Sequence, residues 1–321
     1  MLSHTPVRTP APWTNVYGLA RTLLALGTLL TLAFSDSATL FRPVAFQGNH
    51  PTCHGVEAGG AFCLVPGDEL DAMRWACVAI LLIVASGWRP RLTALPHAYI
   101  SFSVFTGIAI GDGGDQMTAV LTLLLILPAL GDRRRWHWNA ADPNITHPRW
   151  LLLAGVSALV VVRLQMSFVY FQASVSKMPH AEWADGTSMW YWGNSLAFGA
   201  PGWLHTLVGP VLANPVGVAV LTWSPLFIEI SLAAALLVPQ RVRYALLAAG
   251  TGFHLCIAVM MGLWSFALAM WAGVLLLCLP LGGELRMRER PTGHTSSVQR
   301  ARTNATTLDS ENPASRAAAT S

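Results

Sequence analysis

The sequence contains a single lysine, Lys177, among 20 basic residues. It follows Arg163 and Tyr170 at intervals of seven residues, so a helix would carry all three along one face. A desolvated lysine can lose its proton, which arginine cannot do, and a neutral amine can act as a general base. Snorkelling of the ammonium group to lipid headgroups is the structural alternative. We therefore take Lys177 as the main candidate for a catalytic residue.

His254 and Glu229 are two further ionisable residues within apolar stretches, where such residues are costly and often functional. We expect His254 to lie in the half of its helix that is nearer the outside, where it could meet Lys177 and join it in catalysis. A hydrogen-bonded histidine in the core is the structural alternative. Glu229 needs a cation as its partner, and we expect a structural pair with Arg163.

Gln165 and Gln172 form a second polar row on the helix that ends near Lys177. A helix that is polar on two faces cannot face lipid broadly, so we expect this helix to run through the centre of a bundle. Structural hydrogen bonds between helices are an equally good interpretation of the two glutamines.

Two acidic residues, Asp112 and Asp115, lie in the glycine-rich segment 111–116. A tight turn is the structural interpretation, while two carboxylates could also bind a cation or a ligand amine. The segment completes no calcium-loop pattern. Trp183 begins an aromatic segment, residues 182–203, which could lie on the outer leaflet or cover a pocket.

Cys53 and Cys63 belong to a long polar loop, and we expect them to form a disulfide if that loop faces an oxidising compartment. Two free thiols are the alternative. Cys77, Cys256 and Cys278 lie in apolar stretches and are expected to pack as small residues. No cysteine pair has zinc-ligand spacing, so we expect no metal site.

The elements that would position these residues are membrane-spanning helices. Hydrophobic residues make up 53% of the 321 residues and charged residues 11%, against about 25% charged residues in a soluble domain. Since about 20 apolar residues span a bilayer, we predict an all-α polytopic bundle of about eight spans. They are residues 16–34, 72–88, 98–110, 116–130, 150–177, 215–238, 244–261 and 263–279.

Arginine residues gather in alternate connections between these spans, whereas the other connections are richer in acidic residues. The positive-inside rule then places both termini in the cytoplasm, and we expect a multi-pass protein of the bacterial plasma membrane. Residues 1–15 would be a cytoplasmic segment, 16–280 the transmembrane domain, and 281–321 a disordered cytoplasmic tail. No basic patch interleaved with aromatic residues lies outside these loops, which argues against nucleic-acid binding.

Three segments resemble the HTTM superfamily, the membrane domain shared with vitamin K-dependent gamma-carboxylase, and are most like its bacterial sporulation-delaying protein B branch. The resemblance covers most of residues 16–280. The first segment is Asp112-Gly-Gly-Asp115-Gln116 with the apolar run that follows it. The second is Arg163-Leu-Gln165 with Tyr170-Phe-Gln172-Ala-Ser-Val-Ser-Lys177 and Trp183. The third is Phe253-His254 with Met261-Gly-Leu-Trp-Ser-Phe266.

The resemblance implies a helical membrane fold with a site that faces away from the cytoplasm. Lys177 matches the carboxylase lysine that serves as base in vitamin K hydroquinone oxidation, with one extra residue before Trp183, and His254 matches a family histidine. The chain lacks the large lumenal domain of the carboxylase, so glutamate carboxylation is not expected. In the sporulation-delaying branch, the implied role is to help mature or export a secreted peptide toxin.

Our leading hypothesis is that the protein assists maturation of a secreted peptide, with Lys177 and His254 in an outer pocket. Its partners would then be membrane lipids, a secreted peptide precursor and companion maturation proteins, with no nucleic acid. A quinone- or lipid-dependent enzyme is the alternative, with a quinone as the cofactor implied by the resemblance. A non-catalytic membrane scaffold is the third hypothesis, so whether the protein is an enzyme stays open.

Overall fold

The computed structural model describes residues 11–45, 48–142 and 145–285. The helices belong to one compact unit that ends at Glu284, and a second unit contains residues 285–321. The expected cytoplasmic tail lies almost wholly outside the described residues, as does most of the expected N-terminal segment.

Helices form at all eight segments where spans were expected, and no β-strand occurs in the three described ranges, so the all-α prediction is confirmed. Shorter helices connect them: α2 (Ser37–Leu40), α7 (Ala181–Ala184), α8 (Ser188–Gly193) and α9 (Gly202–Leu212). The longer helices are α1 (Asn15–Phe34), α3 (Leu70–Ser86), α4 (Pro90–Gly107), α5 (Gly113–Gly131), α6 (Arg149–Val175), α10 (Pro215–Ala233), α11 (Gln240–Met261) and α12 (Trp264–Cys278).

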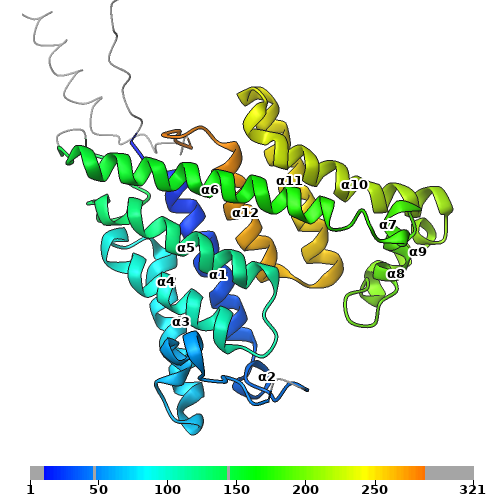
Figure 1. The fold of residues 1–321 in the computed structure, drawn as a ribbon, viewed down its shortest axis with the longest axis horizontal. Helices are drawn as coiled ribbons and strands as arrows, with labels where there is room; N and C mark the ends of the chain where they lie inside the picture. The colour runs from blue at the N-terminus through cyan, green and yellow to red at the C-terminus, as the bar shows by residue number, and fades with distance from the viewer. Residues whose placement is uncertain (1–10, 46–47, 143–144, 286–321) are drawn as a thin grey trace, which may run out of the picture. The chain divides into compact units, whose positions relative to one another are not determined.

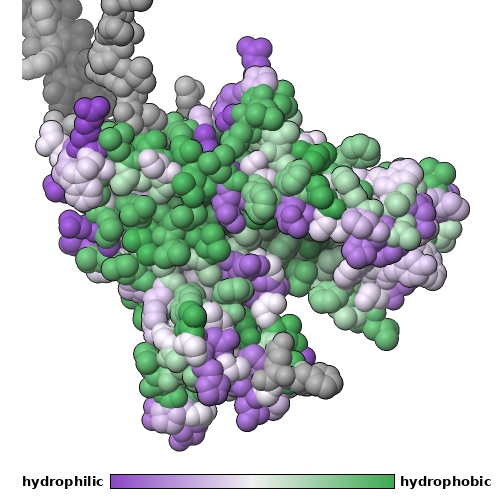
Figure 2. Space-filling view, viewed as in Figure 1, coloured by the Kyte–Doolittle hydropathy of each residue, from purple (hydrophilic) through white to green (hydrophobic). Residues whose placement is uncertain are grey.

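Five of the described helices are long and apolar enough to cross a membrane: α1, α5, α6, α10 with its 3₁₀ extension to Leu237, and α11. α3 has 17 residues and α12 has 15, which is short of the 20 or so that a perpendicular span needs, and α4, with 18 residues, is not among the five. Figure 2 shows a broad hydrophobic surface at the middle of the helical unit, with hydrophilic residues gathered at its margins. The chain is therefore a helical membrane protein; five of its described helices meet the length and composition of a span, and the predicted number of eight spans is not confirmed.

The interior is built around α1 and α12, which pack against each other, while α6 packs against α5, α10 and α12 (Figure 1). Leu24, Leu121, Met166 and Leu277 are fully buried in the resulting core. α6 itself is peripheral, because Leu164, Phe168 and Phe171 on one of its faces are exposed. The expectation that α6 runs through the centre of the bundle is wrong, since its polar groups need only one buried face.

The loop before α3 contains a disulfide between Cys53 and Cys63, whose Cα atoms are 5.5 Å apart. Cys77 and Cys278 are buried, as expected for small packing residues. Cys256 is exposed instead, because it lines a cavity rather than the packed core.

α5 and α12 meet at a glycine. A Cβ added at Gly114 would lie 2.6 Å from the Cα atom of Phe266, so a side chain here must push two backbones apart. At Gly252 in α11, in contrast, an added Cβ would meet nothing within 4 Å. The close approach fixes the start of α5 against the start of α12.

We predict that Gly114→Ala lowers the free energy of unfolding by about 1–3 kcal/mol, the usual cost of overpacking. Thermal unfolding of the purified protein in detergent measures this change. Gly252→Ala is the matched control and should leave the unfolding temperature unchanged or slightly higher, because alanine favours helix. Equal effects of the two substitutions would contradict the close contact between α5 and α12.

Candidate functional site

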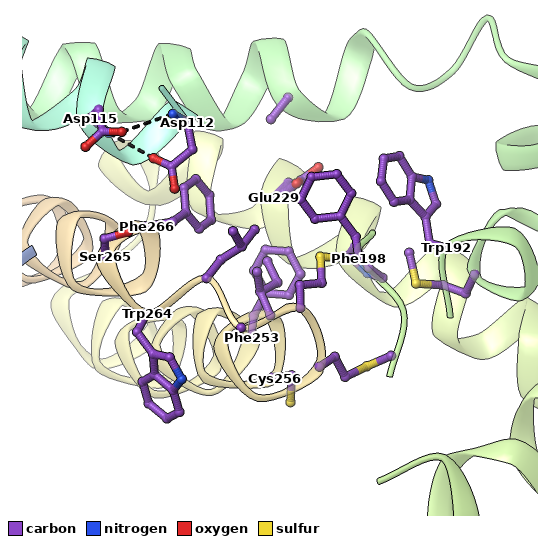
Figure 3. A pocket seen from close by; sticks show the side chains of 18 of the residues that line it. Asp112, Asp115, Trp192, Phe198, Glu229, Phe253, Cys256, Trp264, Ser265 and Phe266 are labelled. Carbon is purple, nitrogen blue, oxygen red and sulfur yellow. Dashed lines mark hydrogen bonds between the residues drawn. The ribbon is translucent and has the colours of Figure 1, made fainter. Parts of the chain in front are cut away.

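A cavity of about 1210 Å³ opens among the C-terminal ends of α1, α6 and α11 and the N-terminal ends of α5 and α12. These are the helix ends that carry the arginine-poor connections. Apolar side chains, among them aromatic residues and methionines, form most of its wall, and Figure 3 shows Phe266 near Asp112 and Phe198 between Glu229 and Trp192. The remaining polar groups on the wall are few, which makes each of them informative.

Lys177 forms an ion pair with Glu229 on the wall of this cavity. Its Nζ atom lies 2.6 Å from Oε1 and 2.7 Å from Oε2 of Glu229, and it also donates to the carbonyl oxygen of Ala173 at 3.0 Å. The side chain of Lys177 is 25% exposed, and that of Glu229 is 7% exposed. Because α6 ends at Val175, Lys177 stands in the turn beyond it and reaches across to α10.

Trp183 covers this ion pair, as Nζ of Lys177 lies 5.4 Å from the centre of the Trp183 ring. The backbone carbonyl of Trp183 accepts a hydrogen bond of 3.1 Å from the indole of Trp223 on α10. Trp183, a residue of α7, is buried and is joined to α10 by this hydrogen bond. An ammonium group above an indole ring gains a cation–π interaction, which is stronger where water is excluded.

The predicted pair of Arg163 with Glu229 is wrong. The Arg163 guanidinium instead donates to the backbone carbonyls of Leu276 and Leu279, at the C-terminal end of α12. These carbonyls lack partners within their own helix, and a cation is favoured at this end of the helix dipole. At a rise of 1.5 Å per residue, Arg163 and Lys177 are about 20 Å apart along α6. Glu229, which contacts Lys177, therefore cannot also reach Arg163.

Tyr170 and His254 form a second buried pair, in which the tyrosine hydroxyl and Nε2 of the histidine are 2.9 Å apart. The His254 ring packs against Phe253 and Phe266, and its Nδ1 atom has no hydrogen-bond partner among the residues described. His254 was expected to contact Lys177, but its Nε2 atom contacts Tyr170 instead. His254 lies behind the cavity wall, to which its neighbour Phe253 contributes.

Asp112 and Asp115 form a capping box at the start of α5. Oδ1 of Asp112 accepts hydrogen bonds from the backbone N–H groups of Gly114 and Asp115, and Oδ2 of Asp115 accepts one from the N–H of Asp112. This satisfies amide groups that the helix leaves unpaired. Both aspartates also line the cavity, so a role toward a ligand amine remains compatible with the cap.

The two glutamines are not part of the site. Gln172 is exposed and Gln165 is partly exposed, and neither lines the cavity. The sequence interpretation did not assign three residues of the wall to the site: Met260 and Phe198, which it did not mention, and Met261, which it named only as part of a family segment. The sequence contained a signal for the two methionines, because they directly precede a glycine, Gly262, and glycine often ends a helix. In the structure, Gly262 has a φ of 74° and ends α11.

Comparison with known proteins gives the family. The HTTM domain matches residues 140–280, and the sporulation-delaying protein SdpB of Bacillus subtilis is 32% identical over 279 residues, which cover 86% of this chain and 84% of SdpB. The chain belongs to the SdpB family of HTTM proteins. The uncharacterized protein YitO of the same organism is 37% identical over 270 residues, with 84% and 86% covered. No solved structure matches.

The HTTM match contains both buried pairs, Lys177–Glu229 and Tyr170–His254. The first lies at the cavity, where it can bind charged or polar groups of a ligand, and the lysine must transfer its proton to Glu229 or to another acceptor before it acts as a base. In an apolar setting, either charge left alone is costly. As long as the ion pair is intact, Lys177 carries a charge, so base chemistry would require that its proton first be removed.

We predict that Lys177→Met and Glu229→Leu each destabilise the protein, since each leaves the other charge unpaired. The double variant should lose less than the sum of the two, with a coupling of about 1–3 kcal/mol. Thermal unfolding of all four proteins in detergent measures the coupling. Strict additivity of the two losses would mean that the ion pair does not form.

We predict that Tyr170→Phe costs about 1–2 kcal/mol of stability, because it removes the hydrogen bond to the buried His254 ring. Tyr244→Phe is the matched control, since Tyr244 is 49% exposed, and it should be nearly silent. The unfolding temperatures of the two variants in the same detergent provide the comparison. A Tyr170→Phe protein as stable as the control would argue against the Tyr170–His254 contact.

Proposed function

We propose that this SdpB-family protein binds an apolar segment of a secreted peptide in the cavity and assists its maturation on the extracytoplasmic side of the bacterial plasma membrane. One observation carries the proposal: a Lys177–Glu229 ion pair is exposed to a large cavity whose wall is otherwise mostly apolar. Apolar walls bind apolar residues, and an ion pair can exchange partners with the charged or polar groups of a peptide.

The size and composition of the cavity support a peptide rather than a compact metabolite. Its volume of about 1210 Å³ exceeds the range of about 300–1,000 Å³ typical of small-molecule pockets. Three methionines line it, Met189, Met260 and Met261, and methionine adapts its shape to varied apolar partners. Such a wall suits a flexible chain whose side chains differ along its length.

The proposed side of the membrane rests on charge. The cavity lies at the helix ends whose connections are acidic, while arginine-rich connections lie at the opposite ends of the same helices. The positive-inside rule assigns the arginine-rich ends to the cytoplasm. Both termini would then be cytoplasmic, and a peptide would reach the cavity after crossing the membrane.

A quinone-dependent reaction is the second candidate, because the amine of the single lysine, Lys177, lies over an indole ring at the edge of a cavity with several aromatic residues. A planar ring could stack on Phe253 or Phe266, with Lys177 as base after proton transfer to Glu229. The two candidates differ at one point: a base must be able to lose its proton, whereas a binding cation need not.

The test compares secreted peptides, measured by mass spectrometry, from a strain lacking the gene and from strains complemented with variants. We predict that Lys177→Gln lowers gene-dependent processed peptides at least tenfold at unchanged membrane abundance. Ser176→Ala is the control, because this exposed hydroxyl only contacts the carbonyl of Ala173. If Lys177→Arg keeps at least half of the wild-type level of processed peptides, recognition of the charge is favoured. If Lys177→Arg loses the processed peptides and the purified protein turns over a quinone, base chemistry is favoured. A silent Lys177→Gln variant would leave only the scaffold hypothesis.

A further inference from the structure

Two connections far apart in the sequence are joined at the helix ends opposite the cavity. The turn between α3 and α4 forms an isolated β-bridge, Trp88 to Trp136, with the connection between α5 and α6. The N–H of Arg89 donates to the carbonyl of Arg135 at 2.8 Å, and the N–H of His137 donates to that of Gly87 at 3.0 Å. The bridge therefore places two arginine clusters next to each other.

Buried polar groups hold this junction rigid. The ring of His137 is fully buried and fits against two glycines, since an added Cβ at Gly18 or Gly87 would lie 2.8 or 2.5 Å from it. Burial, with smaller contributions from Arg21 and Arg134, lowers the pKa of His137 to about 3, so its ring is neutral. Arg134 pairs with the buried Asp132 and donates to the carbonyl of His137.

The junction displays a surface that we call the arginine–tryptophan platform, defined by exposed Arg89, Arg91, Arg133 and Arg135 with partly buried Trp88, Trp136 and Trp138. The guanidinium of Arg89 lies 5.7 Å from the centre of the Trp88 ring. The ion pairs seen among the described residues use other basic side chains. The platform therefore presents four charges on a preformed aromatic base.

Its backbone is held in an uncommon conformation. Arg89 has a φ of 37°, a left-handed value that few residues other than glycine adopt. Such strain persists only where the surroundings impose it, and here the hydrogen bond to Arg135 does so. α4 begins at the next residue, Pro90, and has no acidic residue in its first turn, so no carboxylate of this turn opposes an approaching anion.

We propose that the arginine–tryptophan platform binds the phosphate headgroups of anionic phospholipids. Guanidinium groups form forked hydrogen bonds with phosphate oxygens, and tryptophan favours the level of the headgroups. The platform stands at the ends of apolar helices that cross the membrane, where headgroups are the nearest abundant anions. This lipid site is independent of the function proposed for the cavity.

The test measures binding of short-chain phosphatidylglycerol to the full-length protein in neutral detergent, by native mass spectrometry and by titration. We expect the Arg89→Gln, Arg135→Gln double variant to bind this lipid about tenfold more weakly than wild type. The matched control is Arg149→Gln, Arg241→Gln, which removes the same charge from two exposed arginines outside the platform and should bind as wild type does. Circular dichroism of both variants checks that they are folded.

Three outcomes would overturn the proposal. Equal losses in the two double variants would mean that only net charge matters, and no loss in either would mean that the lipid binds elsewhere. Equal binding of phosphatidylcholine would show that the anionic headgroup is not recognised. Inorganic phosphate that displaces the lipid at millimolar concentration would assign the surface to a soluble anion instead.

Discussion

Polar side chains in an apolar bundle must each find a partner, and one helix face shows how this constraint organises the protein. Arg163, Tyr170 and Lys177 recur every seven residues on α6, and each is satisfied by a different neighbour: α12, α11 and α10. An unpaired polar group in such surroundings costs on the order of 2–7 kcal/mol. The row therefore fixes which three helices α6 can pack against. Those same three helices also contribute residues to the cavity wall.

The constraint also explains why the chemistry gathers at one end of that row. Arg163 and Tyr170 are buried in the packed core with their partners. Lys177 lies beyond the last turn of α6, where the neighbouring helices diverge and a quarter of its side chain remains exposed. Of the three residues in the row, it is the one whose partner a ligand can replace without dismantling the bundle.

A large part of this arrangement could be predicted from the sequence. The prediction failed where the position of a residue along its helix, and thus its level in the membrane, decided the contact. All eight helices were located from apolar runs, because hydropathy reports a local property. The partner of Glu229 was assigned wrongly, because two cations on one helix face look equivalent until their distance along the helix and the position of α10 are known. The contact between Trp88 and Trp136 carries no local signal, since it depends on how two loops meet in space.

The family match and the cavity do not have the same extent, and the difference bears on what the functional unit is. The HTTM domain matches residues 140–280, which include Lys177, Glu229 and His254. Yet the cavity wall also contains Leu30 and Phe34 from α1 and the capping aspartates of α5. Because α12 is packed between α1 and α6, the matched helices alone would leave both α12 and the cavity open to lipid. The helices before residue 140 are therefore part of the site, and a substrate bound beside Lys177 would contact them.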